Sequence, residues 1–154
     1  TGKMGWRYTP YVIEPAAGAT RGLLVYLLDA YHEETVKDAK GNDSTRVVMK
    51  LHPRLAPIKA AILPLVKKEG LPEIAREIVS DFFKAGINVK YDENHAIGKR
   101  YRRHDEAGTP YCITVDGQTK DDGTVTIRNR DTMQQERIPA NEALRIIQKR
   151  LVNS

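Results

Sequence analysis

A run of eight residues near the start of the chain has side chains that suit amine and phosphate chemistry. It reads Glu-Pro-Ala-Ala-Gly-Ala-Thr-Arg over residues 14–21 and joins an expected strand to an expected helix. Glu14 would end the strand, where it can pair with an ammonium group, and Arg21 would stand near the helix start, where phosphate is favoured. The alternative is a surface turn capped by Thr20, and spacing alone favours that alternative.

A second run, Ile97–Gly108, combines cations, an aromatic ring and two carboxylates. The charged residues around Tyr101 are Lys99, Arg100, Arg102, Arg103, Asp105 and Glu106. The basic end can hold nucleic-acid phosphate. A basic-then-acidic helix is also typical of a solvated face with internal ion pairs. The spacing fits Tyr101 packed in the core with Ile97 better than Tyr101 stacked on a base.

A third feature is the alternation in residues 124–130. Val125 and Ile127 share one side of the expected strand, so Thr124, Thr126, Arg128 and Arg130 project from the other. A polar sheet face with a planar guanidinium suits single-stranded RNA, whose bases are read at their exposed edges. The alternative is an exposed sheet edge protected by charges.

Signatures of a complete active site are absent from the sequence. There is no phosphate-binding glycine loop, no G-x-S-x-G and no pair of Cys or His at metal spacing, so we expect no metal site. The scattered histidines are His32, His52, His95 and His104. Cys112 lies in a buried-looking strand, which favours an inert thiol. The missing phosphate loop also disfavours a small enzyme of flavodoxin-like architecture.

The elements that must position these groups form an α/β pattern. Expected strands are 56–65, 87–91, 111–115, 124–130 and 133–138, and expected helices are 72–86, 97–107 and the segment from Pro139. This order predicts a mixed, roughly five-stranded sheet with helices on its faces.

The first 40 residues do not make a self-contained unit, and residues 1–54 are expected to be arranged strand, helix, strand. The strand is expected at Tyr8–Glu14, the helix at Gly22–Tyr31 and the last strand at Arg46–Leu51. The helix has almost no polar face, so it should be buried on all sides, and missing neighbours explain this most simply. We therefore expect a piece of a longer chain, with domains at 1–54 and 55–154.

Composition and charge limit the function classes. The 154 residues carry 25 Lys and Arg against 20 Asp and Glu, a net charge of +5. Residues 1–39 hold four cations against five anions, so the remainder, 21 against 15, holds all of the basic surplus. A single cysteine makes a cytoplasmic location the default. No apolar stretch approaches the ~20 residues of a membrane span, so no membrane association is expected.

Together these stretches resemble the C-terminal part of a class II aminoacyl-tRNA synthetase, most closely the glycyl enzymes of the homodimeric type. Residues 11–21 followed by the apolar helix are similar to motif 3 of that class, and residues 51–57 resemble the exit from its catalytic domain. Residues 97–101, 108–116 and 125–131 resemble the anticodon-binding domain shared with the prolyl, threonyl and histidyl enzymes. The Val-Ile-Glu-Pro string points to glycine.

The resemblance implies roles for the first run. The glycine pocket would be lined by Glu14, Pro15, Ala16, Ala17 and Gly18. The ATP phosphates would meet Gly18, Ala19, Thr20 and Arg21, with Arg21 as the catalytic motif 3 arginine. Two positions depart from the family: Ala16 stands where Ser is frequent, and Thr20 where an acidic residue is frequent. A small side chain at position 16 still suits a pocket that excludes larger amino acids.

The resemblance also implies a partner, the glycine tRNA. The anticodon would be read by Arg128 first and Arg130 second, with Arg102 and Arg103 also in contact. The parent enzyme would use ATP with Mg²⁺ to make glycyl-adenylate and would be a homodimer. Motifs 1 and 2 have no counterpart here, so the isolated chain should be inactive, bind no cofactor and mainly bind tRNA. The alternative is a synthetase-derived accessory or regulatory module without aminoacylation activity.

Overall fold

The structure, a computed structural model, describes residues 5, 9–37 and 41–153. Its N-terminal elements are α1 (Ala19–Ala30), β1 (Tyr31–Lys37) and β2 (Asp43–Met49). The next are β3 (Ala60–Pro64), α2 (Leu71–Lys84), β4 (Val89–Tyr91), α3 (Ile97–Glu106) and β5 (Tyr111–Val115). The last are α4 (Gly117–Asp122), β6 (Thr124–Asn129), β7 (Gln135–Pro139), the 3₁₀ turn η1 (Ala140–Glu142) and α5 (Ala143–Val152).

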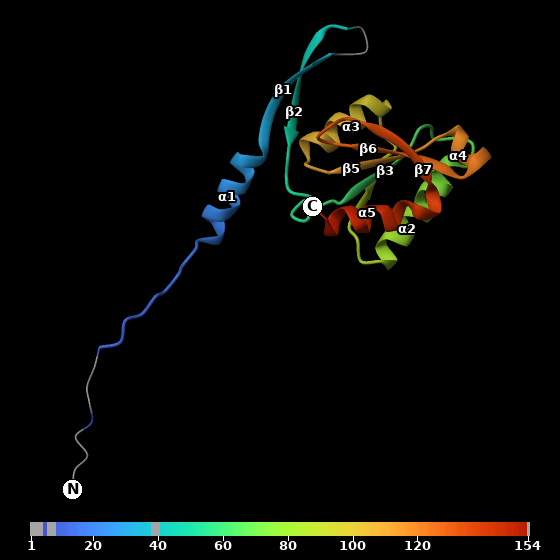
Figure 1. The fold of residues 1–154 in the computed structure, drawn as a ribbon. Coiled ribbons are helices and arrows are strands. Elements are labelled where there is room, and N and C mark those ends of the chain that lie inside the picture. The colour runs from blue at the N-terminus through green and yellow to red at the C-terminus, as the bar shows by residue number, and fades with distance from the viewer. Residues whose placement is uncertain (1–4, 6–8, 38–40, 154) are drawn as a thin grey trace.

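The predicted mixed sheet is confirmed and has five strands in the order β4-β3-β5-β6-β7. β3 pairs in parallel with both β4 and β5, whereas β5, β6 and β7 pair antiparallel. Every residue of β3 and of β5 is buried. Continuous apolar strands need cover on both faces, and the helices supply it (Figure 1).

Each face of the sheet has its own core. α2 and α5 cover one face, where Ile62, Phe82, Ile113, Ile127 and Ile147 belong to one buried cluster. α3 covers part of the other face, where Ala61, Leu63 and Cys112 pack with Ile97 and Tyr101. Tyr101 is therefore a core residue, as its spacing predicts. Burial raises the pKa of the Cys112 thiol to about 12, so this group is inert at neutral pH.

A buried arginine fixes α3 to the ends of two strands. Arg100 donates through Nη1 to the carbonyl oxygens of Pro64 and Asp92, at 2.6 and 3.1 Å, and through Nη2 to that of Leu65 at 3.2 Å. Backbone carbonyls at strand ends lack ladder partners, and this guanidinium satisfies three of them. The α3 axis is thereby set relative to β3 and β4.

The hairpin of β1 and β2 packs beside α3 and forms a separate two-stranded sheet. The hairpin can pack there because the chain after β2 approaches the backbone of Gly108, at the end of α3, very closely. Gly108 has a φ of +76°, and a Cβ there would lie 2.8 Å from Cδ1 of Leu51 and 3.2 Å from the carbonyl oxygen of Met49. Only glycine has both the conformational freedom and the missing side chain that this junction requires.

Two expectations about elements are wrong. Residues 9–14 form no strand, and their side chains are exposed because no neighbouring strand pairs with them; Tyr8 lies outside the described residues. The chain continues from α1 directly into β1, so the N-terminal part runs helix, strand, strand rather than strand, helix, strand. α4 was also missed, although Asp116 and Thr119 form the capping box that starts it.

Candidate nucleic-acid interface

A buried carboxylate joins the hairpin, α3 and β6. Asp105, on the last turn of α3, has no exposed side-chain surface. Its Oδ1 accepts from Nη1 of Arg128 at 2.8 Å, and its Oδ2 accepts from Nη2 of Arg128 and from Nε of Arg46, both at 3.0 Å. A carboxylate this deep is stable only when charge and hydrogen bonding compensate it, and two guanidinium groups supply both.

Arg46 carries this network onto the hairpin. Its side chain lies on β2 and is fully buried, and its Nη1 donates to Oε2 of Glu34 on β1 at 2.8 Å. Its Nη2 donates to the backbone carbonyl of Arg130, just beyond β6. Glu34 also pairs with Lys50 at 2.5 Å, and that contact is the largest cause of the lowered pKa of Glu34. One arginine thus links both strands of the hairpin to the five-stranded sheet.

Arg128 lies on the side of β6 opposite Val125 and Ile127, as the alternation predicts, but it is buried there. Only 7% of its side chain is exposed, and its guanidinium lies 4.8 Å from the centre of the Tyr101 ring. Burial acts to lower the pKa of Arg128, but the hydrogen bonds that Arg128 donates to Asp105, together with the charge of Asp105, outweigh burial and raise it. Base reading by Arg128 stays a prediction, and it would use N–H groups that do not donate to Asp105.

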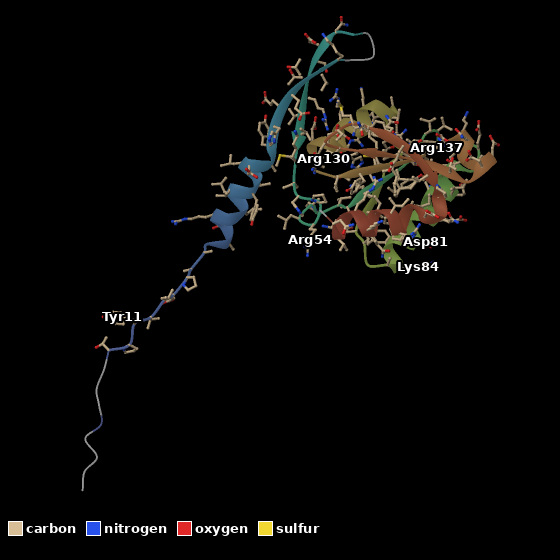
Figure 2. The ribbon with its side chains drawn as sticks, viewed as in Figure 1. Tyr11, Arg54, Asp81, Lys84, Arg130 and Arg137 are labelled. Atoms are coloured by element: carbon tan, nitrogen blue, oxygen red, sulfur yellow. The ribbon has the colours of Figure 1, made fainter. Side chains whose placement is uncertain are left out.

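Arg130 is buried as well. Its Nη1 donates to the carbonyl of Gly108 at 2.9 Å, and its Nε and Nη2 donate to Asp131 at 2.8 and 3.0 Å. Figure 2 labels Arg130 where the sheet meets the hairpin and Arg137 at the opposite end of the sheet. Arg130 therefore connects the end of β6 to the end of α3, close to Asp105. Its contact with an anticodon likewise stays a prediction.

The outer half of this sheet face, on β6 and β7, is polar and partly open. Arg137 pairs with Thr126 in the strand register and donates to Oδ1 and Oδ2 of Asp116, at 2.8 and 2.7 Å. It also donates to the hydroxyls of Thr124 and Thr126, at 2.7 and 3.1 Å. The hydrogen bond from Arg137 is the largest cause of the lowered pKa of Asp116.

Sequence reasoning missed Arg137 as part of this face. Its signal was available, since β7 continues the hairpin that places Thr126 opposite it. Gln135, the register partner of Arg128, is exposed on the same face. A flat surface of hydroxyl, amide and guanidinium groups offers donors and acceptors at fixed positions, which is what edge recognition of unpaired bases needs.

The two other predicted arginines lie on the outer side of α3. Arg103 donates to Oδ2 of Asp92 at 2.7 Å and lies 3.0 Å from Nδ1 of His95. Arg102 is half-buried. Below them His104 is buried, which lowers its pKa and keeps the ring neutral near pH 7. Both arginines sit on the helix that covers the inner half of this sheet face, beside the polar outer half.

The first run is placed at the start of α1, apart from the other groups. Glu14 is exposed in an extended segment, and Gly18 rather than Thr20 is the residue that caps the helix. The Arg21 side chain folds back over Gly18, with its Cβ, Cγ and Cδ each 3.8 Å from where a glycine Cβ would stand. The apolar side of α1 is exposed, including Leu24, and α1 projects from the body of the molecule (Figure 1).

Within the described residues no cluster of three or more His, Cys, Asp or Glu has the arrangement of a metal site. Among those same residues, no helix combines the length and apolarity that crossing a membrane requires.

The family model described as "Anticodon binding domain" matches residues 59–150. The chain belongs to this family. The match falls inside the predicted second domain, whose boundary near Arg54 stays a prediction.

The chain is similar to curated bacterial proteins named glycine–tRNA ligase. It is 55% identical over 145 residues to the protein of Rhodopirellula baltica, covering 94% of this chain and 27% of that one. It is 50% identical over 147 residues to that of Treponema denticola, covering 96% of this chain and 32% of the relative. The chain therefore spans less than a third of the length of these two relatives.

A solved structure shows the same fold. The prolyl-tRNA synthetase of Cryptosporidium parvum, complexed with L-proline and AMP, superposes with a TM-score of 0.64 and 24% identity. The match covers 77% of this chain and 32% of that one.

Replacement of Asp105 tests the buried network. Asp105→Asn leaves the charge of Arg128 buried without a carboxylate and leaves Arg46 with Glu34 alone, so the free energy of unfolding should fall by about 3–5 kcal/mol in urea denaturation. The matched control is Asp81→Asn on α2, whose exposed pair with Lys84 spans 3.4 Å (Figure 2). That control should lose less than about 1 kcal/mol. Equal losses in the two variants would contradict a structural role for the network.

Proposed function

We propose that this chain is the tRNA-binding C-terminal part of a glycine–tRNA ligase and that residues 55–154 bind the anticodon of the glycine tRNA. The observation that carries the proposal is the match at 50–55% identity, across nearly the whole chain, to proteins of that name. The family match over 59–150 and the basic surplus after residue 39 support the same function.

The polar face of β6 and β7 is the proposed base-reading surface. Thr124, Thr126 and Arg137 form its outer half, and Arg128 forms its floor next to α3. Arg137 is already oriented by Asp116, so binding costs little side-chain entropy there. Of the predicted anticodon residues, Arg102 and Arg103 would contact the loop from α3, while Arg128 and Arg130 would act from inside the junction.

The first run is proposed to serve the parent enzyme in glycine activation. Glu14 would bind the glycine amino group, with residues 15–18 forming the pocket wall. Arg21 would bind the ATP phosphates at the start of α1, where the helix terminus already favours anions. ATP with Mg²⁺, a homodimeric parent and a cytoplasmic location complete this proposal. The exposed groups of α1 support it, because the remainder of such an enzyme would have to cover them.

Titration with RNA tests the anticodon proposal. The chain should bind a stem-loop with the glycine anticodon more tightly than one with a scrambled loop of equal length and charge, because base edges rather than phosphates carry the difference. Fluorescence anisotropy at one stated salt concentration measures both affinities. A preference of tenfold or more is expected, whereas equal affinities would count against anticodon recognition.

Substitution of Arg21 in the full-length enzyme tests the activation proposal. Arg21→Ala should reduce glycine-dependent ATP–pyrophosphate exchange about 100-fold, and tRNA charging with it, because the phosphate contact acts before tRNA is involved. Lys84→Ala, an exposed lysine on α2, is the control and should change neither rate. Unchanged exchange in Arg21→Ala would rule out the phosphate contact.

A further inference from the structure

A groove of about 570 Å³ lies between the β1–β2 hairpin and the outer side of α3. Its polar lining residues are Lys37, Ser44, Lys99, Arg102, Arg103 and Glu106. Lys99, Arg102, Arg103 and Glu106 follow one another at the spacing that places them on one side of a helix. The groove is separate from the polar face of β6 and β7, and it carries four cations against one anion.

Two of the four cations have no carboxylate partner among the residues that the structure describes. Lys37 pairs with Asp43 at 2.5 Å and Arg103 with Asp92 at 2.7 Å, whereas the ion pairs of the described residues include neither Lys99 nor Arg102. The Nη1 of Arg102 is moreover buried with no hydrogen-bond partner. An N–H donor without an acceptor costs free energy, so a turn of the Arg102 side chain that brings Nη1 to an anion in the groove would be favoured.

We propose that this groove binds backbone phosphates of RNA, beyond the anticodon bases. The choice of RNA rests on the function proposed above; the choice of phosphate rests on the groove itself. Arg102 offers a planar fork suited to phosphate oxygens, and Lys99 adds a point charge one turn earlier. Glu106 lies one turn after Arg102 and would repel an anion, so the phosphates sit toward Lys99 and Lys37.

The position of Gly98 agrees with this placement. It belongs to the first turn of α3 and lines the groove, and no atom would lie within 4 Å of a Cβ placed there. A phosphate strand can therefore approach the backbone of this turn closely. The same helix carries Asp105 and the Tyr101 ring beneath Arg128, so RNA held in the groove would lie next to the base-reading face.

The salt dependence of RNA binding tests the groove. The double variant Lys99→Gln/Arg102→Gln should lower affinity for the glycine anticodon stem-loop and for the scrambled loop by the same factor. The slope of log affinity against log salt should become shallower by about 2, one unit for each lost phosphate contact. The single variant Lys99→Gln, at an exposed side chain, should make the slope shallower by about 1. It provides the test if the double variant is unstable.

The charge-matched control is Lys84→Gln/Lys149→Gln, on the two helices that cover the opposite face of the sheet. This control should leave the slope of log affinity against log salt within error of that of the unsubstituted chain. If the slope of log affinity against log salt is unchanged in the groove variant, the groove does not bind phosphate. This conclusion would stand even if the chain prefers the glycine anticodon loop. Conversely, equal affinity of the unsubstituted chain for both loops would refute anticodon recognition. A shallower slope in the groove variant would in that case still support phosphate binding in the groove.

Inorganic phosphate is the second probe and separates an RNA backbone from a free anion. At constant ionic strength, millimolar phosphate should leave stem-loop binding nearly unchanged, because one isolated phosphate lacks the neighbouring contacts. Tight binding of inorganic phosphate by the parent chain, lost in the groove variant, would overturn the assignment to RNA.

Discussion

The arrangement of this molecule depends on one carboxylate, Asp105, buried between two arginines that come from different parts of the chain. An unpaired charge at that depth would be costly, so α3, β2 and β6 are stable together only in the geometry that brings Arg46 and Arg128 to it. A two-stranded hairpin is marginally stable by itself. Docking through Arg46 therefore explains why β1 and β2 are ordered beside the sheet.

The ion pairs of Asp105 lie between the part of the sheet that helices cover and the part that is polar and partly exposed. One face is closed by α2 and α5 over an apolar core, and α3 closes half of the other. The remaining half, on β6 and β7, bears hydroxyls and an arginine already bound by Asp116. Asp105 forms the border, because it holds Arg128 inward and α3 in place. Rigid positioning of polar groups beside a basic helix suits recognition of flexible single-stranded RNA.

Sequence pattern predicted the parts of this fold that depend on local periodicity. The apolar runs gave β3 and β5, and alternation placed Arg128 on the correct side of β6. The alternation could not show that Arg128 is buried. Its partner Asp105 lies 23 residues away in the sequence and contacts Arg128 only because α3 packs on the sheet. Residues 9–14 have strand-like composition but no strand to pair with. β1 was missed because its run of polar residues has no apolar alternation.

Native-state hydrogen exchange tests most directly whether the Asp105 network makes the hairpin and the sheet one unit. If it does, the hydrogen-bonded amides of β2 should exchange only through the same global opening as those of β5, with free energies of opening that agree within about 1 kcal/mol. Exchange of the β2 amides by local opening, at free energies several kcal/mol below those of β5, would contradict the account.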